Sequence, residues 1–189
     1  MAHLLDLTKP LHFVVDNVLS IEECQSLINV IEERGPRLAP ITTARGPLID
    51  ADIRNNTRVM FDDEALAERL FQRIKRHCPP EIKGLEIVGA NERLRCYKYE
   101  VGQRFAPHYD GAFFRSDNER SFLTYLIYLN DNFEGGQTDL LSLGKKIAPK
   151  PGRALLFQHA ILHEGCAVTR GIKYAVRSDV MYRTRAGVV

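Results

Sequence analysis

Short apolar runs separated by turn residues occupy the chain from about residue 85 onward. The runs lie near 92–99, 104–109, 121–129, 137–141, 153–158 and 173–183. Glycine, proline or asparagine separates them, and several short strands divided in this way are typical of a β-sandwich or barrel. The number of runs fits a jelly roll, in which two sheets face each other. We therefore expect a mainly β (α+β) fold with a jelly-roll core over residues 86–189.

The first 85 residues are expected to support this core. A capping box at Ser20 and Glu23 predicts a helix that ends at Gly35-Pro36. An apolar stripe predicts a second helix from about Asp63 to Cys78. Residues 11–16 read as a strand and residues 43–57 as a loop. With 189 residues in all, we expect one domain over 1–189, with 1–85 as its helical and strand support.

Composition excludes several classes of partner. The formal net charge is +2, which is too small to indicate nucleic acid. No apolar stretch approaches the roughly 18 residues of a membrane span, and the N-terminus has no signal-peptide pattern. The four cysteines form no CxxC pair. We expect a cytoplasmic protein with reduced thiols and no membrane partner, and the sequence leaves its oligomeric state unknown.

Two histidines and a carboxylate could form a metal site. His108 and Asp110 are two residues apart at the end of a predicted strand, so both side chains point to the same face. His159 and His163 follow a later apolar run, and spacing alone leaves both as the second histidine. Two histidines and one carboxylate suit non-haem Fe(II) and leave adjacent coordination positions open for a 2-oxo acid and O2. Such an open site argues against structural zinc.

A lysine follows this group on the last predicted strand. Lys173 comes ten residues after His163, within an alternating run. A cation on a strand next to the metal could bind the distal carboxylate of 2-oxoglutarate.

At this point the sequence resembles a known family. The region 92–183 is similar to the catalytic domain of prolyl 4-hydroxylases, within the 2-oxoglutarate/Fe(II) oxygenase superfamily. The matching stretches, in the family's order, are Tyr99–Gly102, Phe105–Asp110, Thr124–Asn130, Gly135–Thr138, Pro151–Phe157, His163–Val168 and Gly171–Lys173. The resemblance covers about half the chain and implies a double-stranded β-helix.

The resemblance also implies roles for the metal ligands. Fe(II) would be held by His108, Asp110 and His163, which favours His163 over His159. The reaction would be oxidative decarboxylation of 2-oxoglutarate by O2, coupled to hydroxylation of a substrate C–H bond. Ascorbate would support the iron, as it does in the family.

The same resemblance implies residues for the cosubstrate. Lys173 would pair with the distal carboxylate of 2-oxoglutarate. Tyr99 and Thr138 would donate hydrogen bonds to the same molecule.

The substrate half of the family's pattern is altered. Asp179 stands about where those enzymes place a tryptophan, and Phe105 replaces a frequent tyrosine. Arg120 stands where the family has an arginine that contacts a peptide. We expect the substrate to enter over residues 111–120 and 45–58, with Phe114, Arg120 and Arg58 in contact. A peptide or protein is favoured over a small molecule.

Three other functions compete with a peptide or small-molecule hydroxylase. A non-catalytic sensor of metal or 2-oxoglutarate would have no use for the full triad and lysine. A nucleic-acid dealkylase on the same scaffold would need a basic surface with aromatic side chains. A zinc hydrolase would need a general base, for which Glu164 is the only nearby residue.

Overall fold

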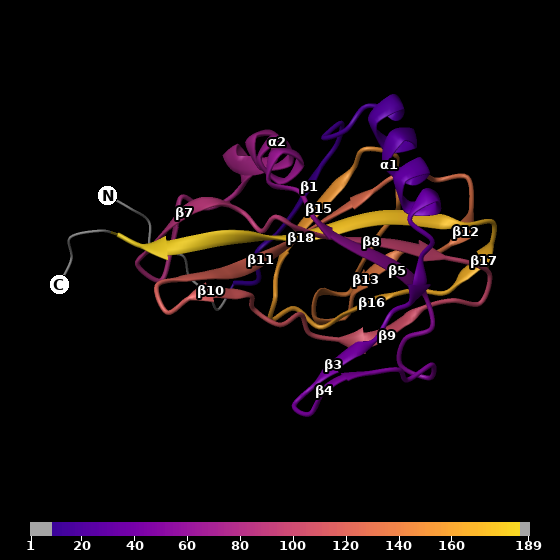
Figure 1. Ribbon diagram of the computed structural model, residues 1–189. Coiled ribbons are helices and arrows are strands. Elements are labelled where there is room, and N and C mark those ends of the chain that lie inside the picture. The colour runs from indigo at the N-terminus through magenta and orange to yellow at the C-terminus, as the bar shows by residue number, and fades with distance from the viewer. Residues whose placement is uncertain (1–8, 186–189) are drawn as a thin grey trace.

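A large antiparallel sheet forms the body of the molecule (Figure 1). The computed structural model describes residues 9–185. Across this part of the chain the central strands follow the order β1 (His12–Val15), β15 (Ala154–Gln158), β11 (Glu119–Tyr128), β18 (Lys173–Thr184), β8 (Arg93–Tyr99), β5 (Thr57–Asp62) and β2 (Arg37–Leu38). Further strands attached to it are β6 (Glu81–Ile82), β7 (Leu85–Ala90) and β10 (Phe114–Ser116). The long strand β18 pairs with β11, β8 and β7 and so links them.

A smaller sheet completes the double-stranded β-helix. Its strands are β14 (Lys145–Ile147), β13 (Thr138–Leu140), β16 (His163–Gly165) and β9 (Phe105–His108). Two strand pairs flank it, β12 (Glu134–Gly135) with β17 (Val168–Arg170) and β3 (Ile41–Thr43) with β4 (Gly46–Leu48). A 3-10 turn, η2 (Leu141–Leu143), joins β13 to β14. The predicted mainly β jelly roll with N-terminal helices is confirmed.

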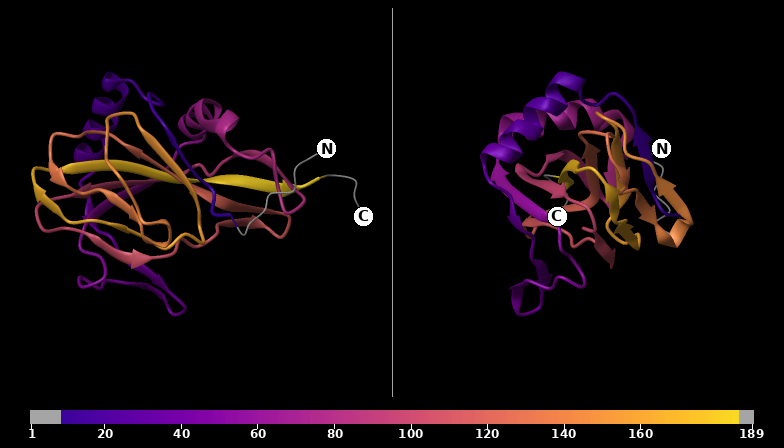
Figure 2. Two further views of the ribbon diagram at one scale, coloured as in Figure 1. Left: turned by 180° about the vertical axis from the view of Figure 1, so that it is seen from behind. Right: turned by 90° about the vertical axis from the view of Figure 1, so that its right-hand side faces the viewer.

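Two helices lie on one side of the large sheet (Figures 1 and 2). Helix α1 (Ile21–Glu33) begins with the predicted capping box, in which the Ser20 hydroxyl accepts from the backbone of Glu23 and the Glu23 carboxylate accepts from that of Ser20. Helix α2 (Glu64–Ile74) is capped by Asp63 and continues into the 3-10 turn η1 (Lys75–His77). Among the described residues, no helix is long and apolar enough to cross a membrane.

The two faces of the large sheet have different surroundings. Leu94, Cys96 and Val176 are fully buried and belong to the same core cluster as Ile31 of α1 and Leu70 of α2. Successive side chains of a strand point to opposite faces. The intervening residues of β8 and β18 therefore face the smaller sheet, and the site forms between the two sheets.

The predicted loop over residues 43–57 and the predicted substrate entrance over residues 111–120 both contain strands. Residues 43–57 include β4 and reach the first residue of β5, and residues 111–120 include β10. Strands of three residues are too short to show a readable alternation, so no sequence pattern indicated them. The hairpin β3–β4 projects beside β9 (Figure 1).

Candidate active site

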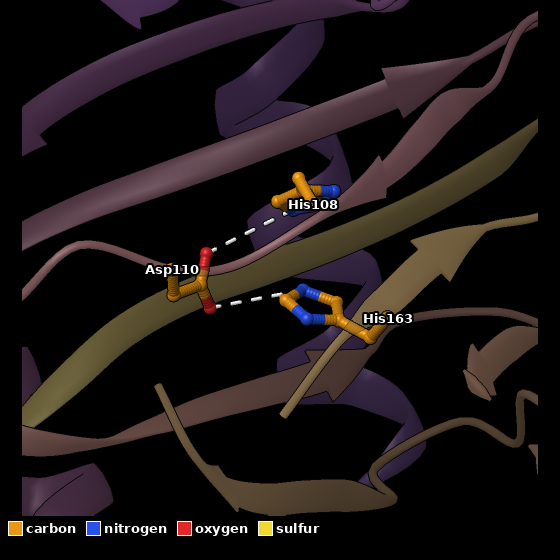
Figure 3. A group of neighbouring side chains, drawn as sticks. All are labelled: His108, Asp110 and His163. Carbon is orange, nitrogen blue, oxygen red and sulfur yellow. Dashed lines mark ion pairs between the residues drawn. The ribbon is translucent and has the colours of Figure 1, made fainter. Parts of the chain in front are cut away.

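Strand pairing brings the three predicted metal ligands together. His108 ends β9 and lies directly opposite His163 of β16, and Asp110 follows two residues after His108. The Nε2 atoms of both histidines lie 3.8 Å from the Asp110 carboxylate oxygens (Figure 3). One nitrogen or oxygen atom from each side chain lies within 4.8 Å of the others. Small side-chain movements would therefore let all three contact one ion.

The backbone sets the orientation of both imidazole rings. The Nδ1 atom of His108 lies 2.8 Å from the carbonyl of Ala106, and that of His163 lies 2.9 Å from the carbonyl of Ile161. A carbonyl only accepts, so each Nδ1 carries the proton and each Nε2 keeps its lone pair. Burial lowers the pKa of His108 to about 4 and also lowers that of His163. Both rings are therefore neutral at pH 7, as metal ligands must be.

Asp110 is held in its charged form by its neighbours. Arg177 contacts one of its oxygens at 3.1 Å, and the Thr124 hydroxyl donates to the other at 2.6 Å. Burial alone would raise the pKa of Asp110. The charges of Arg177 and His163 and the bond from Thr124 outweigh burial, so the pKa lies below its usual value. Such partners fix the orientation of a carboxylate ligand.

The competing residues lie elsewhere. His159 is buried and its ring lies between Ser121, at 2.8 Å, and Thr124, at 3.0 Å. It is absent from the group formed by His108, Asp110 and His163. Glu164, the base that a zinc hydrolase would need, groups instead with Asp139 and Cys166.

Lys173 lies on the floor of the same pocket. It is 2 % exposed, and its ammonium donates to the carbonyl of Gly136 at 2.6 Å. An ammonium has three donors, and no carboxylate of residues 9–185 pairs with this one, so donors remain for an incoming anion. Burial lowers the pKa of Lys173 to about 8. Gly136 has a φ of +65°, and a side chain there would press against Lys173.

Hydroxyl groups surround this lysine. Tyr99 lies opposite Lys173 in register, and the ammonium is 4.9 Å from the centre of its ring. Thr138 accepts a 2.7 Å hydrogen bond from the hydroxyl of Tyr128, whose ring is 5.5 Å from the ammonium. Tyr99, Thr138 and Lys173 line one pocket with the three candidate metal ligands.

Of the three predicted substrate residues, Phe114 and Arg120 lie opposite each other in register, and Arg58 lies apart from them on another strand. Arg58 is on β5, opposite Tyr97 in register, and Tyr97 lines the pocket. Phe114 is 62 % exposed on β10. Arg120 lines a separate surface pocket that includes His159. The structure thus places only Arg58 beside a residue of the pocket wall.

Comparison with known proteins identifies the family. The model of the 2OG-Fe(II) oxygenase superfamily matches residues 94–178. The chain is 30 % identical to probable prolyl 4-hydroxylase 8 of Arabidopsis thaliana over 203 residues, which is 88 % of this chain and 67 % of that protein. The chain belongs to the prolyl 4-hydroxylase-like 2OG-Fe(II) oxygenases. It is a 2-oxoglutarate- and Fe(II)-dependent dioxygenase, with O2 as the other cosubstrate.

Solved structures share the fold of this oxygenase. A viral collagen prolyl hydroxylase from Paramecium Bursaria Chlorella virus-1, in a 2OG complex, aligns with a TM-score of 0.63 at 24 % identity, over 90 % of this chain and 95 % of that one. A prolyl hydroxylase in complex with a hypoxia inducible factor peptide fragment, from Trichoplax adhaerens, aligns with a TM-score of 0.64 at 19 % identity, over 92 % and 83 %.

Residues that hold Asp110 were missed at the sequence level. Thr124 and Arg177 both line the pocket of this oxygenase. Arg177 shares a strand face with Lys173, since the two are four residues apart on β18. That spacing was the sequence signal that could have placed Arg177 in the site. The contact between Arg177 and Asp110 could not be predicted from the sequence, because the two residues are 67 positions apart along the chain.

Acid is expected to destabilise the metal-free oxygenase. Burial lowers the pKa of His108 and His159 to about 4, against about 6.5 for an unfolded histidine. Between these values the unfolded chain binds more protons, so stability is full above about pH 6.5 and falls as the pH approaches about 4. Each of the two histidines contributes at most roughly 3 kcal/mol.

Urea unfolding across this pH range, with a chelator present, measures the loss. His159→Gln should reduce the slope of unfolding free energy against pH by the amount that corresponds to roughly one bound proton. A stability that does not change over this range, or an unchanged slope in the variant, would contradict the assignment of neutral buried rings.

Proposed function

We propose that this oxygenase hydroxylates prolyl residues of a peptide or protein, with Fe(II) held by His108, Asp110 and His163. The observation that carries the iron site is the convergence of two Nε2 lone pairs and one charged carboxylate. The donor set fits, because two histidines and a carboxylate leave adjacent positions open for ligands.

We further propose that Lys173 pairs with the distal carboxylate of 2-oxoglutarate and that Tyr99 and Thr138 donate to it. Once bound, iron and 2-oxoglutarate supply the oxidising power for hydroxylation by O2. The chain orients these groups. Lys173 provides the buried charge, and Arg177 and Thr124 keep Asp110 ionised and aligned.

The prolyl substrate is supported by the relatives. The Arabidopsis relative and the two solved structures described above are named as prolyl hydroxylases, and one of the solved structures is a complex with a peptide. The segment before β5, which includes residues 53 and 54, is placed to form one side of a binding groove for such a substrate. It lies along β9, where the backbone of Ala106 donates to the carbonyl of Ile53 at 2.8 Å and Arg54 forms a bridge with Phe105.

Mass spectrometry of peptide products tests this function. The oxygenase, loaded with Fe(II), is incubated aerobically with 2-oxoglutarate and a panel of prolyl peptides. We expect one oxygen on proline and one succinate for each hydroxylation, with neither in His163→Ala. If free amino acids and not peptides stimulate succinate release, the chain is a small-molecule hydroxylase and the peptide proposal is wrong.

We propose that a bound peptide extends from the pocket over β10 and β11, where Phe114 and Arg120 lie opposite each other outside the pocket lining. Arg120→Ala is therefore expected to raise the KM for the peptide by roughly tenfold or more, since a hydrogen bond to a charged group contributes about 1.5–3 kcal/mol. Phe114→Ala should raise it less. Arg115→Ala is the matched control, because Arg115 lies on the same hairpin and pairs with Glu92. If the KM for 2-oxoglutarate rose in parallel, Arg120 would support the cosubstrate site rather than contact the peptide.

A further inference from the structure

A row of arginines lies on the site-facing side of the large sheet. In register, Arg58 of β5 is opposite Tyr97 of β8, and Arg177 of β18 is opposite Arg95 of β8. Tyr97 and Arg95 are two residues apart, so all four side chains share one face. Tyr97 and Arg177 line the pocket that contains His108, and the row is therefore next to the iron site.

The carboxylates on this face do not neutralise the row. Asp179 accepts from Arg95 at 3.1 Å and from Arg177 at 3.2 Å, and it also accepts from the amide of Asn91. Asp110 contacts Arg177 but is a proposed iron ligand. Within residues 9–185, Arg58 makes no hydrogen bond or ion pair with its side chain. The row therefore carries positive charge in excess.

Two further donors in this region have no partner. The Nε atom of Arg177 and the Nη2 atom of Arg54 are buried without a hydrogen bond. The Arg54 guanidinium lies 4.8 Å from the centre of the Tyr97 ring, which places it beside the same row. Buried donors without partners are rare and costly. The presence of two such donors beside the arginine row indicates that a bound ligand supplies acceptors to them.

The cosubstrate would not supply them. In the function proposed above, 2-oxoglutarate uses one carboxylate on Lys173 and the other at the iron. Burial and repulsion from neighbouring arginines lower the pKa of Arg58, in agreement with the absence of a carboxylate partner for it among the described residues. An anionic group of the substrate would supply the missing acceptors.

We propose that Arg58 and Arg177 form a subsite for a carboxylate of the substrate, which makes an acidic peptide the preferred substrate. This inference rests on the proposed function and names the class of peptide. The planar fork of a guanidinium binds a carboxylate through two parallel hydrogen bonds. An aspartate or glutamate close to the target residue would supply that group.

Peptide binding without oxygen tests the subsite. The oxygenase with Fe(II) and 2-oxoglutarate is titrated anaerobically with three prolyl peptides of one sequence. One has glutamate beside proline and an amidated end, the second has glutamine there and an amidated end, and the third has glutamine and a free C-terminal carboxylate. We expect the glutamate peptide to bind roughly tenfold or more tighter than the amidated glutamine peptide. The third peptide should resemble the second.

Variants separate the subsite from general charge effects. Arg58→Gln should remove the preference for glutamate, and Arg58→Lys should keep part of it. Arg69→Gln is the control, because Arg69 is exposed on α2, across the sheet from the site. Equal affinity for the two amidated peptides, no affinity for either, or a preference that survives Arg58→Gln would overturn the inference. Tightest binding of the third peptide would also overturn it, by assigning the subsite to a chain terminus.

Admission of oxygen separates this inference from the proposed function. Glutamate-dependent binding with no hydroxyproline formed would refute prolyl hydroxylation and support the carboxylate subsite. Equal hydroxylation of both amidated peptides would support prolyl hydroxylation and overturn the subsite.

Discussion

His163→Ala is expected to abolish stable iron binding and all turnover, whereas His159→Ala should retain iron. The two histidines are four residues apart, are similarly buried and follow the same strand. Of these two histidines, only His163 has its Nε2 atom near the Asp110 carboxylate, at 3.8 Å. His159 contacts Thr124, which holds Asp110, so its loss acts indirectly. Loss of such an indirect partner typically lowers metal affinity by about 10- to 100-fold.

Iron content after anaerobic reconstitution and the rate of succinate formation measure this difference. A circular dichroism spectrum of each metal-free variant checks that it has folded. The assignment would be wrong if His163→Ala retained one iron per chain while His159→Ala lost it.

Lys173→Ala is expected to weaken 2-oxoglutarate binding by roughly 10- to 150-fold, which corresponds to about 1.5–3 kcal/mol for a hydrogen bond to a charged group. The reason is that Lys173 is buried, lies at the pocket floor and has no carboxylate partner of its own among the described residues. Iron affinity should change little, since Lys173 contacts none of the proposed ligands.

Titration of the Fe(II)-loaded protein with 2-oxoglutarate in the absence of oxygen gives the affinity. Lys98→Ala is the matched control, because Lys98 neighbours this region on β8 but points to the other face and pairs with Glu32. An affinity that is unchanged in Lys173→Ala, or equally reduced in Lys98→Ala, would refute the role of Lys173.

Local patterns predicted much of the fold. The capping box at Ser20 and the apolar stripe after Asp63 each define a helix start through contacts within a few residues. The longer strands β8, β11 and β18 are readable because each is a mostly buried run of at least seven residues. Strands β5 and β7 were missed. Strand β5 lies in the predicted support region, and β7 precedes the first predicted strand of the core, which begins near residue 92.

The parts of the candidate site that depend on local spacing could be predicted from the sequence, and the parts that depend on contacts between distant segments could not. His108 and Asp110 are two residues apart, and the alternation of a strand predicts that both point to one face, although β9 ends at His108. The placement of His163 beside them depends on the pairing of β9 with β16, which spacing left open and the resemblance favoured. Arg177 of the large sheet contacts Asp110, which follows β9 of the smaller sheet, and no local pattern reports such a contact.

The substrate side was the least accessible to sequence reasoning. Phe114 and Arg120 are near Asp110 along the chain, yet the hairpin of β10 and β11 separates their side chains from the pocket lining. Arg58 is 50 residues from His108 in sequence but lies beside Tyr97 of the pocket wall. Proximity along the chain was therefore a poor guide to proximity in space.

The ratio of products to oxygen consumed tests the central claim most directly. The Fe(II)-loaded protein is supplied with 2-oxoglutarate and an unmodified prolyl peptide that it hydroxylates, while oxygen uptake, succinate and hydroxyproline are measured together. We predict equal amounts of all three, and none of them in His163→Ala. Failure of the wild-type protein to convert 2-oxoglutarate into succinate, with iron bound at one per chain, would contradict the account.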